Sequence, residues 1–318
     1  MTALHVVRDA LRATDLPRGG IATIGNFDGM HLGHRRILER VAARAHETQR
    51  PSVALTFEPH PLSVLRPDHA PRRLQTLRQK EETLEEIGIE NLLVIPFTRD
   101  FSLTEPEEFV REVLCARLAV SEVYLGSHFA FGRGKRGDIA LLARMGPECG
   151  FVASSVQEVI FEGEPVSSTR IRKAIARGDV TSAAAMLGRE YAIDGLVAKG
   201  DKVGRRIGYP TINLEPENDL HPADGVYVTQ IDIRSFGRRF DCVTNIGRRP
   251  TVYEDYATVI ETYVLDFSAN VYGERVRLYF FERLREERRF PSVTALSDQI
   301  GRDIEATRTY FSRRQGGP

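Results

Sequence analysis

The hydrophobic pattern of this chain changes near residue 190. Before that point, short apolar runs recur about every 30 to 40 residues, the spacing of repeated strand–helix units. After it, apolar and polar residues alternate, as at 226–233 and 275–280, which is typical of antiparallel strands. The sequence therefore predicts an α/β plus β fold: a parallel α/β domain over residues 1–188, then an antiparallel β-barrel over 189–318 that is capped by a helix. The apolar runs of the first domain are residues 21–25, 53–57, 92–95 and 123–126.

Helical spacing predicts the elements that cover these strands. One helix carries Thr83, Leu84 and Ile87, and a second starts at Pro106, which suits a first helical turn. The last helix starts at residues 291–292. Ligands of open parallel sheets bind at the carboxyl ends of the strands, so we expect the loops that follow residues 24, 57 and 126 to converge there. The second helix is expected to bury Phe109, Val110, Val113 and Leu114, and the last one Val293, Leu296, Ile300 and Ile304.

The composition excludes several classes of protein. The 44 basic and 44 acidic residues balance, so no overall positive field is present to recruit nucleic acid. No apolar run approaches the roughly 18 residues of a membrane span, and no export signal is recognisable. Three widely separated cysteines, Cys115, Cys149 and Cys242, predict neither a disulfide framework nor a zinc site. We therefore expect a cytoplasmic protein with small-molecule partners, and we leave a homo-oligomer open.

A glycine-rich turn joins the first strand to the first helix. It contains two histidines, His31 and His34, three residues apart at the predicted helix start. Backbone amides and the positive end of a helix dipole would face one spot there, which favours a phosphate site. A tight turn with two solvated histidines is the alternative. The turn residues that precede the histidines are Gly25, Asn26, Phe27, Asp28 and Gly29.

This turn resembles the HxGH signature of the nucleotidylyltransferase superfamily, in the GxFDGxHxGH form of bacterial FAD synthetases. Residues 56–61 (TFEPHP) and 167–172 (SSTRIR) are similar to that family's second and third motifs. In the second half, three stretches resemble bacterial riboflavin kinase, namely residues 208–213, 245–251 and 261–267. Six motifs in order identify the chain as resembling the bifunctional riboflavin kinase/FMN adenylyltransferase family. The resemblance implies a Rossmann-like first domain, ATP as co-substrate, Mg²⁺, and riboflavin, FMN and FAD as substrate and products.

For the adenylyltransferase site, the resemblance implies that His31 and His34 donate to the phosphates of ATP, beside Asn26 and neighbouring backbone amides. The serine-rich third motif would hold the β- and γ-phosphates, although it also suits the N-cap of a helix over 170–177. His60 is expected near the site, or in an ordinary loop. His128 stands where the family commonly has Asp or Asn, and Phe129 suits the core or a flavin wall. The third-motif residues are Ser167, Ser168, Thr169 and Arg170.

The kinase site cannot be a GxxxxGK[ST] phosphate loop, because the chain has none. A glycine-dense basic loop over 200–211 is the alternative cradle. Thr211 and Asn213 would share one face of a strand and offer the neutral oxygens that Mg²⁺ accepts. Ile212 replaces the family's usual alanine on the opposite face. The loop residues assigned to ATP or flavin binding are Gly204, Arg205, Gly208 and Pro210.

Glu261 is the expected general base of the kinase. It shares a strand face with Tyr263 and other apolar side chains, where an unpaired carboxylate is costly. The resemblance implies that it accepts the proton of the riboflavin 5′-hydroxyl; a salt bridge to Arg277 or another barrel arginine is the alternative. Tyr263 stands where many relatives carry histidine, which leaves the flavin contact nearby open.

Two other functions were weighed. Residues 132–137 match GxGxxG, but they follow the fourth strand after six intervening residues, so a dinucleotide-dependent oxidoreductase is disfavoured and a basic loop is expected. A non-catalytic flavin-binding regulator is disfavoured because the residues implied in catalysis are all present.

Overall fold

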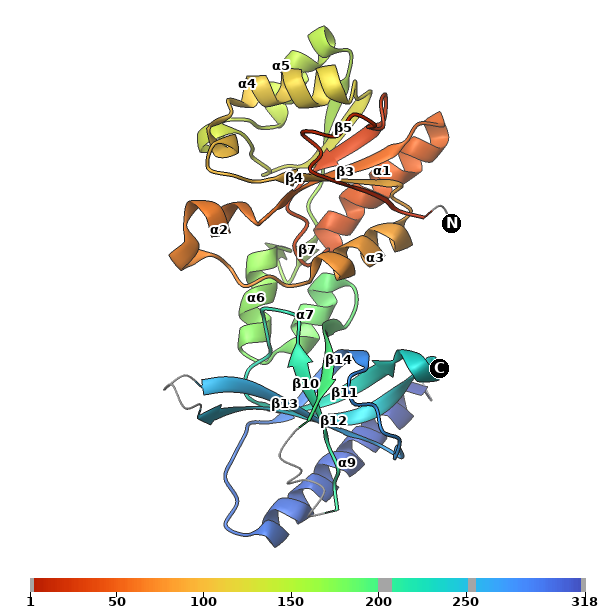
Figure 1. The fold of residues 1–318 in the computed structure, drawn as a ribbon, viewed down its shortest axis with the longest axis vertical. Coiled ribbons are helices and arrows are strands. Elements are labelled where there is room, and N and C mark those ends of the chain that lie inside the picture. Colours follow the sequence, from red (N-terminus) through yellow and green to blue (C-terminus); the bar gives the residue numbers. More distant parts are fainter. Residues whose placement is uncertain (1–2, 200–207, 251–255, 316–318) are drawn as a thin grey trace. The chain divides into compact units, whose positions relative to one another are not determined.

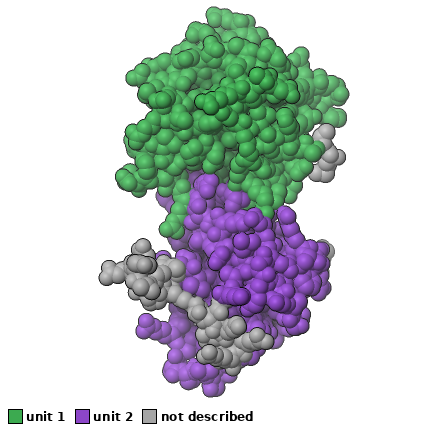
Figure 2. All heavy atoms as spheres, viewed as in Figure 1, with its two compact units in different colours: residues 1–72, 77–167 green, residues 73–76, 168–318 purple. Residues whose placement is uncertain are grey.

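The computed structural model describes residues 3–199, 208–250 and 256–315. The chain forms two compact units (Figure 2). The first unit comprises Met1–Arg72 and Leu77–Ser167, and the second comprises Arg73–Thr76 and Ser168–Pro318.

The first unit is built on a six-stranded parallel sheet with strand order β1-β4-β3-β2-β5-β6 (Figure 1). Its central strand β2 is buried along its whole length and β3 up to Phe57, because helices cover both faces. The predicted parallel α/β domain is thus confirmed. The strands are β1 (His5–Arg8), β2 (Ile21–Ile24), β3 (Ser52–Glu58), β4 (Asn91–Pro96), β5 (Glu122–Gly126) and β6 (Val152–Val156), with a short hairpin of β7 (Ile160–Phe161) and β8 (Glu164–Pro165).

Two apolar cores lie on the two faces of this sheet. On one face α1 and α3 contribute Leu38, Val41 and Leu84. On the other, the predicted helix that starts at Pro106 and the helix α5 contribute a second cluster that includes Phe109 and Leu142. The helices are α1 (Leu32–Thr48), α2 (Pro61–Leu65), α3 (Leu77–Ile87), α4 (Pro106–Phe109) with its π-helical continuation η3 (Val110–Arg117), and α5 (Ile139–Cys149); single 3₁₀ turns are η1 (Pro67–His69), η2 (Phe101–Leu103) and η4 (Arg133–Lys135).

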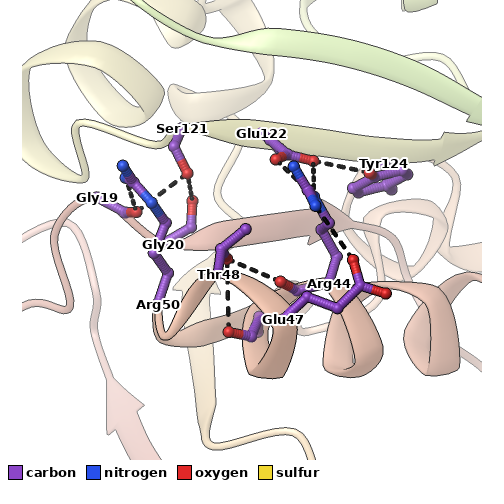
Figure 3. A network of polar contacts seen from close by, with 10 residues as sticks. Gly19, Gly20, Arg44, Glu47, Thr48, Arg50, Ser121, Glu122 and Tyr124 are labelled. Atoms are coloured by element: carbon purple, nitrogen blue, oxygen red, sulfur yellow. Dashed lines mark hydrogen bonds and ion pairs between the residues drawn. The ribbon is translucent and has the colours of Figure 1, made fainter.

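A polar network anchors the second half of α1 to the start of β5 (Figure 3). Arg44 Nε donates to both carboxylate oxygens of Glu122 at 2.9 and 3.1 Å, and its Nη1 donates to Glu47 at 3.1 Å. The Tyr124 hydroxyl donates to the same Glu122 carboxylate at 2.7 Å. These contacts lie at the amino end of β5, so the opposite end of α1, its N-terminus, is held at the carboxyl edge of the sheet.

The second unit is a closed antiparallel barrel with strand order β10-β13-β12-β11-β14-β9. The predicted barrel is confirmed, with six strands. Two helices, α6 and α7, precede it, and 3₁₀ turn η5 and helix α9 complete the unit. Their bounds are α6 (Ser168–Ala176), α7 (Val180–Leu187), β9 (Tyr191–Ala198), β10 (Ile212–Pro216), β11 (Gly225–Ile233), η5 (Arg234–Phe236), β12 (Arg238–Pro250), β13 (Tyr256–Val264), β14 (Arg275–Arg285) and α9 (Val293–Gln315).

Hydroxyl groups bridge strands inside the barrel. The hydroxyls of Thr229 and Thr244 are 2.7 Å apart, and those of Thr244 and Thr262 are 2.9 Å apart. All three residues are buried. Because each hydroxyl can donate one bond and accept another, this chain keeps buried polar groups satisfied between three neighbouring strands.

Helix α9 packs against the outer face of the barrel at β11 and β12. It begins directly after Ser292, whose hydroxyl accepts a hydrogen bond from the Ala295 N–H at 3.1 Å, so the predicted start is correct. Ile304 is buried against Val226 and Val243, as expected for an inward-facing residue. Val293 is 63% exposed, so its predicted inward position is wrong; the first turn of the helix extends past the apolar surface.

Helices α6 and α7 belong to the compact unit of the barrel, although they precede the predicted boundary at residues 188/189. Helix α7 contacts β9 and β14, and the Thr181 hydroxyl donates to the Phe281 carbonyl at 3.2 Å. Leu187 and Met186 on α7 are buried. The assignment of one activity to each side of residue 188 stays a prediction.

Cys115 and Cys149 form a disulfide, with Cα atoms 5.5 Å apart. The expectation that the cysteines would be unpaired was therefore wrong for these two. Cys115 lies on η3 and Cys149 at the end of α5, and these two elements cover the same face of the sheet. The two cysteines are 34 residues apart along the chain, and this separation does not indicate a disulfide. Cys242 is a buried free thiol, and burial raises its pKa.

Candidate active sites

The glycine-rich turn begins where β2 ends and forms a strained bend. Phe27, Gly29 and Met30 all have positive φ, at 47°, 85° and 44°. For Phe27 and Met30 this conformation is costly, and both side chains are fully buried, which holds them in place. Strained backbone of this kind persists where the surroundings over-determine it, commonly at ligand sites.

The two histidines stack on each other at the start of α1. Their ring centroids are 3.7 Å apart, and the His34 N–H donates to Nδ1 of His31 at 3.4 Å, which makes His31 the N-cap of the helix. Because Nδ1 of His31 accepts, neutral His31 carries its proton on Nε2. His31 is buried, so the alternative of two solvated histidines is wrong.

His34 is held in its neutral form. Its Nδ1 is buried, and no hydrogen-bond partner for it occurs in the part of the chain that the structure describes. Burial, and then the nearby charges that His31 and Lys80 can carry, lower the pKa of His34 well below its ordinary value of 6.5. A neutral imidazole can donate one hydrogen bond without presenting a full charge, and the protein environment keeps it in that state at neutral pH.

Gly33 lies between the two histidines at a position with little space for a side chain. A Cβ on Gly33 would lie 3.2 Å from the His31 ring, which is tighter than an ordinary contact, and 4.0 Å from the carbonyl oxygen of Val166. The segment that leads into the third motif, with Ser167, therefore passes close to the histidine turn within the first unit. Ser168, Thr169 and Arg170 open α6 in the second unit. Their place beside the histidines stays a prediction.

Lys80 is a site residue that the sequence analysis missed. It lies on α3, is 7% exposed, and its Nζ donates to the Asn26 carbonyl at 2.9 Å and to the Thr56 hydroxyl at 3.2 Å. A signal for it was present: Lys80 is three and four residues before Thr83 and Leu84, on the inward face of the helix.

The other residues predicted for this site have local structural partners. Nδ1 of His60 accepts the Leu62 N–H at 3.2 Å and so caps α2. Nε2 of His128 lies 3.3 Å from a carboxylate oxygen of Glu158, on the surface. Phe129 packs against the core, which agrees with the first of its two expected roles, a core residue or a flavin wall.

In the barrel, three polar residues form a row across neighbouring strands. Glu261 on β13 is directly opposite Asn213 on β10 on one side and Asn245 on β12 on the other. Residues directly opposite in antiparallel strands project to the same face, so two amides flank the carboxylate. Asn245 had not been assigned a role, because the strand register that brings it to Glu261 is a tertiary feature.

Glu261 is partly exposed, whereas Ile260 and Thr262 on the other face of β13 are buried in the barrel. Tyr263 and Leu265, which were expected on the same face as Glu261, pack in an apolar cluster with Val243, so the expected apolar face is confirmed for these two residues. Arg277 donates to both carboxylate oxygens of Asp194, at 2.5 and 2.8 Å. A salt bridge from Glu261 to a barrel arginine stays an open alternative.

A cavity of about 490 Å³ lies in the barrel unit. Pro210 and Thr211 line it, as do Ile212 and Val264, which lie on the strand face opposite to that of Glu261. The loop after β13, residues 267–272, forms most of its other wall and was not assigned a role from the sequence. Gly208 is exposed, with φ at +89°. Gly204 and Arg205 lie outside the described residues.

Two family models match the chain, one to each half. The model described as FAD synthetase matches residues 14–170, and the one described as riboflavin kinase matches residues 187–311. A bifunctional riboflavin kinase/FMN adenylyltransferase from Haemophilus influenzae is 34% identical, with 97% of this chain and all of the relative covered. The chain belongs to this bifunctional family.

Other family members agree with this assignment. The Pseudomonas fluorescens protein is 39% identical, with 92% of this chain and 93% of that protein covered. The fold class and enzyme class predicted from the six motifs are thereby confirmed. The same fold also occurs in a solved structure described as a macrolide-efflux protein from Streptococcus pneumoniae, with a TM-score of 0.87, 29% identity, and 96% of this chain and 99% of that one covered. Among the described residues, no helix has the length and apolar character that a membrane crossing requires.

The alternative function, a dinucleotide-dependent oxidoreductase, agrees neither with membership in this family nor with the structure of this chain. The GxGxxG residues lie in the connection from β5 to α5, but they follow β5 only after five intervening residues, and Phe131 and Gly137 pair with each other and close the loop between them. Within it, Arg133 and Arg136 form ion pairs with Glu105. The predicted basic loop is the better description.

Proposed function

We propose that this chain makes FAD from riboflavin in two steps, each of which uses ATP. The barrel unit phosphorylates riboflavin to FMN, and the α/β unit transfers AMP from a second ATP to FMN. The observation that carries the proposal is the stacked histidine pair at the N-terminus of α1, held by a strained turn at the carboxyl end of β2. Membership in the bifunctional family supports both reactions.

Adenylyl transfer needs positioning more than covalent chemistry. An oxygen of the FMN phosphate bonds to the α-phosphorus of ATP, and the bond from that phosphorus to the bridging oxygen breaks, which releases pyrophosphate. In this proposal His31 donates from Nε2, and His34 from its ring, to phosphate oxygens as negative charge moves toward the leaving group. Amides of Gly25–Gly29 line the cradle, and Ser167, Ser168, Thr169 and Arg170 hold the β- and γ-phosphates.

In the kinase step, Glu261 acts as general base. It accepts the proton of the riboflavin 5′-hydroxyl while that oxygen bonds to the γ-phosphorus of ATP, and ADP leaves. The amides of Asn213 and Asn245 flank Glu261 in register on the two neighbouring strands. The cavity of about 490 Å³ in the same unit, lined by Pro210 and Thr211, is large enough for part of a nucleotide.

Mg²⁺ belongs to this proposal as the ion that accompanies ATP. No cluster of three or more histidine, cysteine or acidic residues that could hold a metal occurs among the described residues. Mg²⁺ is commonly held by substrate phosphates, waters and one or two protein oxygens. Thr211 and Asn213 would supply those oxygens, and the ion would neutralise phosphate charge.

The test is an assay of purified protein with ATP, Mg²⁺ and either riboflavin or FMN, followed by chromatography. Wild type is expected to form FMN and then FAD. The double variant His31→Ala/His34→Ala should accumulate FMN and lose FAD formation by about 10² to 10³-fold or more, since each removed donor costs that much. His46→Ala, an exposed histidine on the same helix, is the control and should behave as wild type. Near-normal FAD formation by the double variant contradicts the histidine assignment.

A further inference from the structure

A lysine is buried behind the histidine turn. Lys80 is 7% exposed, whereas lysines usually keep their ammonium group in water. Its Nζ is withdrawn to the end of β2, where it donates to the Asn26 carbonyl at 2.9 Å and to the Thr56 hydroxyl at 3.2 Å. Burial of an ammonium group is costly even when it is hydrogen-bonded. A position of this kind calls for a compensating role.

The group that Lys80 holds lies within the strained turn. The Asn26 carbonyl also accepts from the Thr56 hydroxyl at 3.3 Å, so donors from two elements, α3 and β3, converge on one oxygen. The next residue, Phe27, is the first of three with positive φ. Fixing the carbonyl of Asn26 fixes the peptide plane from which the strained bend starts, and thereby the approach to the histidine pair.

The charge of Lys80 also reaches the histidines. The ammonium contributes, after burial and His31, to the lowered pKa of His34. Lys80 on α3 and His31 on α1 are the charged or titratable groups that act on His34 in this way.

We propose that Lys80 is a positioning residue of the adenylyltransferase site. It holds the Asn26 carbonyl so that the turn keeps the histidine pair in place, and its ammonium group acts electrostatically on His34. This inference rests on the function proposed above, and its test therefore includes a measurement that does not depend on activity.

The first measurement is FAD formation from FMN and ATP by full-length variants. Lys80→Met is expected to lower kcat by about 10²-fold, with a smaller change in KM, because misplaced donors act mainly on the transition state. Lys80→Arg keeps the charge, and its kcat is expected to be about tenfold higher than that of Lys80→Met. Lys135→Met removes an exposed lysine from the same unit and should leave the rate unchanged. A Lys80→Met rate within about threefold of wild type overturns the proposal.

The second measurement is the NMR titration of His34. Removal of a like charge should raise its pKa in Lys80→Met and leave it near the wild-type position in Lys80→Arg, because arginine retains the charge. If Lys80→Met does not fold, Lys80→Gln is judged by the same two criteria. If the His34 pKa in Lys80→Met equals that of wild type, the Lys80 proposal is overturned, whether or not wild type forms FAD. If the His34 pKa shifts as expected but wild type forms no FAD, only the proposed function is rejected.

Discussion

Glu261 has the neighbours that a proton acceptor needs. It is partly exposed and lies between Asn213 and Asn245 in register. Because it is only partly buried, a substrate hydroxyl can reach its carboxylate, and the two amides beside it can hold hydrogen-bonding groups of that substrate.

We predict that Glu261→Gln loses riboflavin phosphorylation and keeps FMN adenylylation. The substitution preserves size but removes basicity, and positioned general bases typically contribute about 10² to 10⁴ in rate, so the kinase kcat should fall by that factor with little change in KM. Glu282→Gln, an exposed glutamate on β14, is the matched control. Both activities and the melting temperature are measured on one preparation. An active but less stable Glu261→Gln protein assigns Glu261 a structural role instead.

Residue types in a motif could be predicted from the sequence, but their neighbours in space could not. His31, His34, Thr211 and Glu261 stand in stretches whose spacing is informative by itself. Lys80 and Asn245 reach the same two places through the packing of α3 and the register of β12. The helical spacing of Lys80 indicates that it faces inward, but it does not indicate which groups it contacts. The same limit explains Glu261, whose exposure depends on which face of β13 lines the barrel.

At the scale of elements, the central strands were predicted closely and the edge strands were missed. Strands β2 to β5 are apolar runs because both of their faces are covered. Strands β1 (His5–Arg8) and β6 (Val152–Val156) are the two edges of the sheet and carry exposed or polar residues, which no continuous apolar run marks. The disulfide between η3 and α5 was missed for a related reason, since their shared face is set by the sheet.

Two helical glycines should respond oppositely to alanine. Alanine is favoured over glycine in a helix by about 1 kcal/mol. In α9, a Cβ on Gly301 would make an ordinary contact 3.8 Å from the Tyr209 hydroxyl, so Gly301→Ala should stabilise the barrel unit. In α5, a Cβ on Gly146 would clash with the backbone carbonyl of Phe151, so Gly146→Ala should destabilise the α/β unit despite the helical preference.

The measurement is the temperature at which each activity is lost. Gly301→Ala should raise this temperature for riboflavin phosphorylation, and Gly146→Ala should lower it for FMN adenylylation, while the other activity of each variant stays at its wild-type value. Equal shifts of both activities would show that the two units do not unfold independently and would contradict the assignment of one activity to each.

At the scale of the whole molecule, the change of hydrophobic period located the start of the barrel but not the edge of its compact unit. Strand β9 begins at Tyr191, as predicted. Residues 168–187 are helical, like the first unit, yet they pack with the barrel, and residues 73–76 do so as well. A pattern along the chain reports which faces are apolar, but not which partner covers them.

Fragments test this division. Residues 1–188, which retain the entire third motif, are expected to convert FMN to FAD, and residues 168–318 to convert riboflavin to FMN. Fragment 189–318 lacks α7, which buries Val180, Met186 and Leu187, and should melt at lower temperature than 168–318. Fragment 1–167 lacks Arg170 and should lose adenylylation. Equal thermal stability of the two barrel fragments argues against a role for α7 in covering β9 and β14.

The boundary between the two compact units, between Ser167 and Ser168, falls inside the third motif. Under the proposed function, residues 168–188 would belong to the nucleotide site of the first enzyme, while their helix α7 contacts β9 and β14 of the barrel. Read as a gene fusion, the proposal predicts that a division of the chain on either side of these residues costs one partner. A gene that encoded either activity alone would need its own copy of residues 168–188.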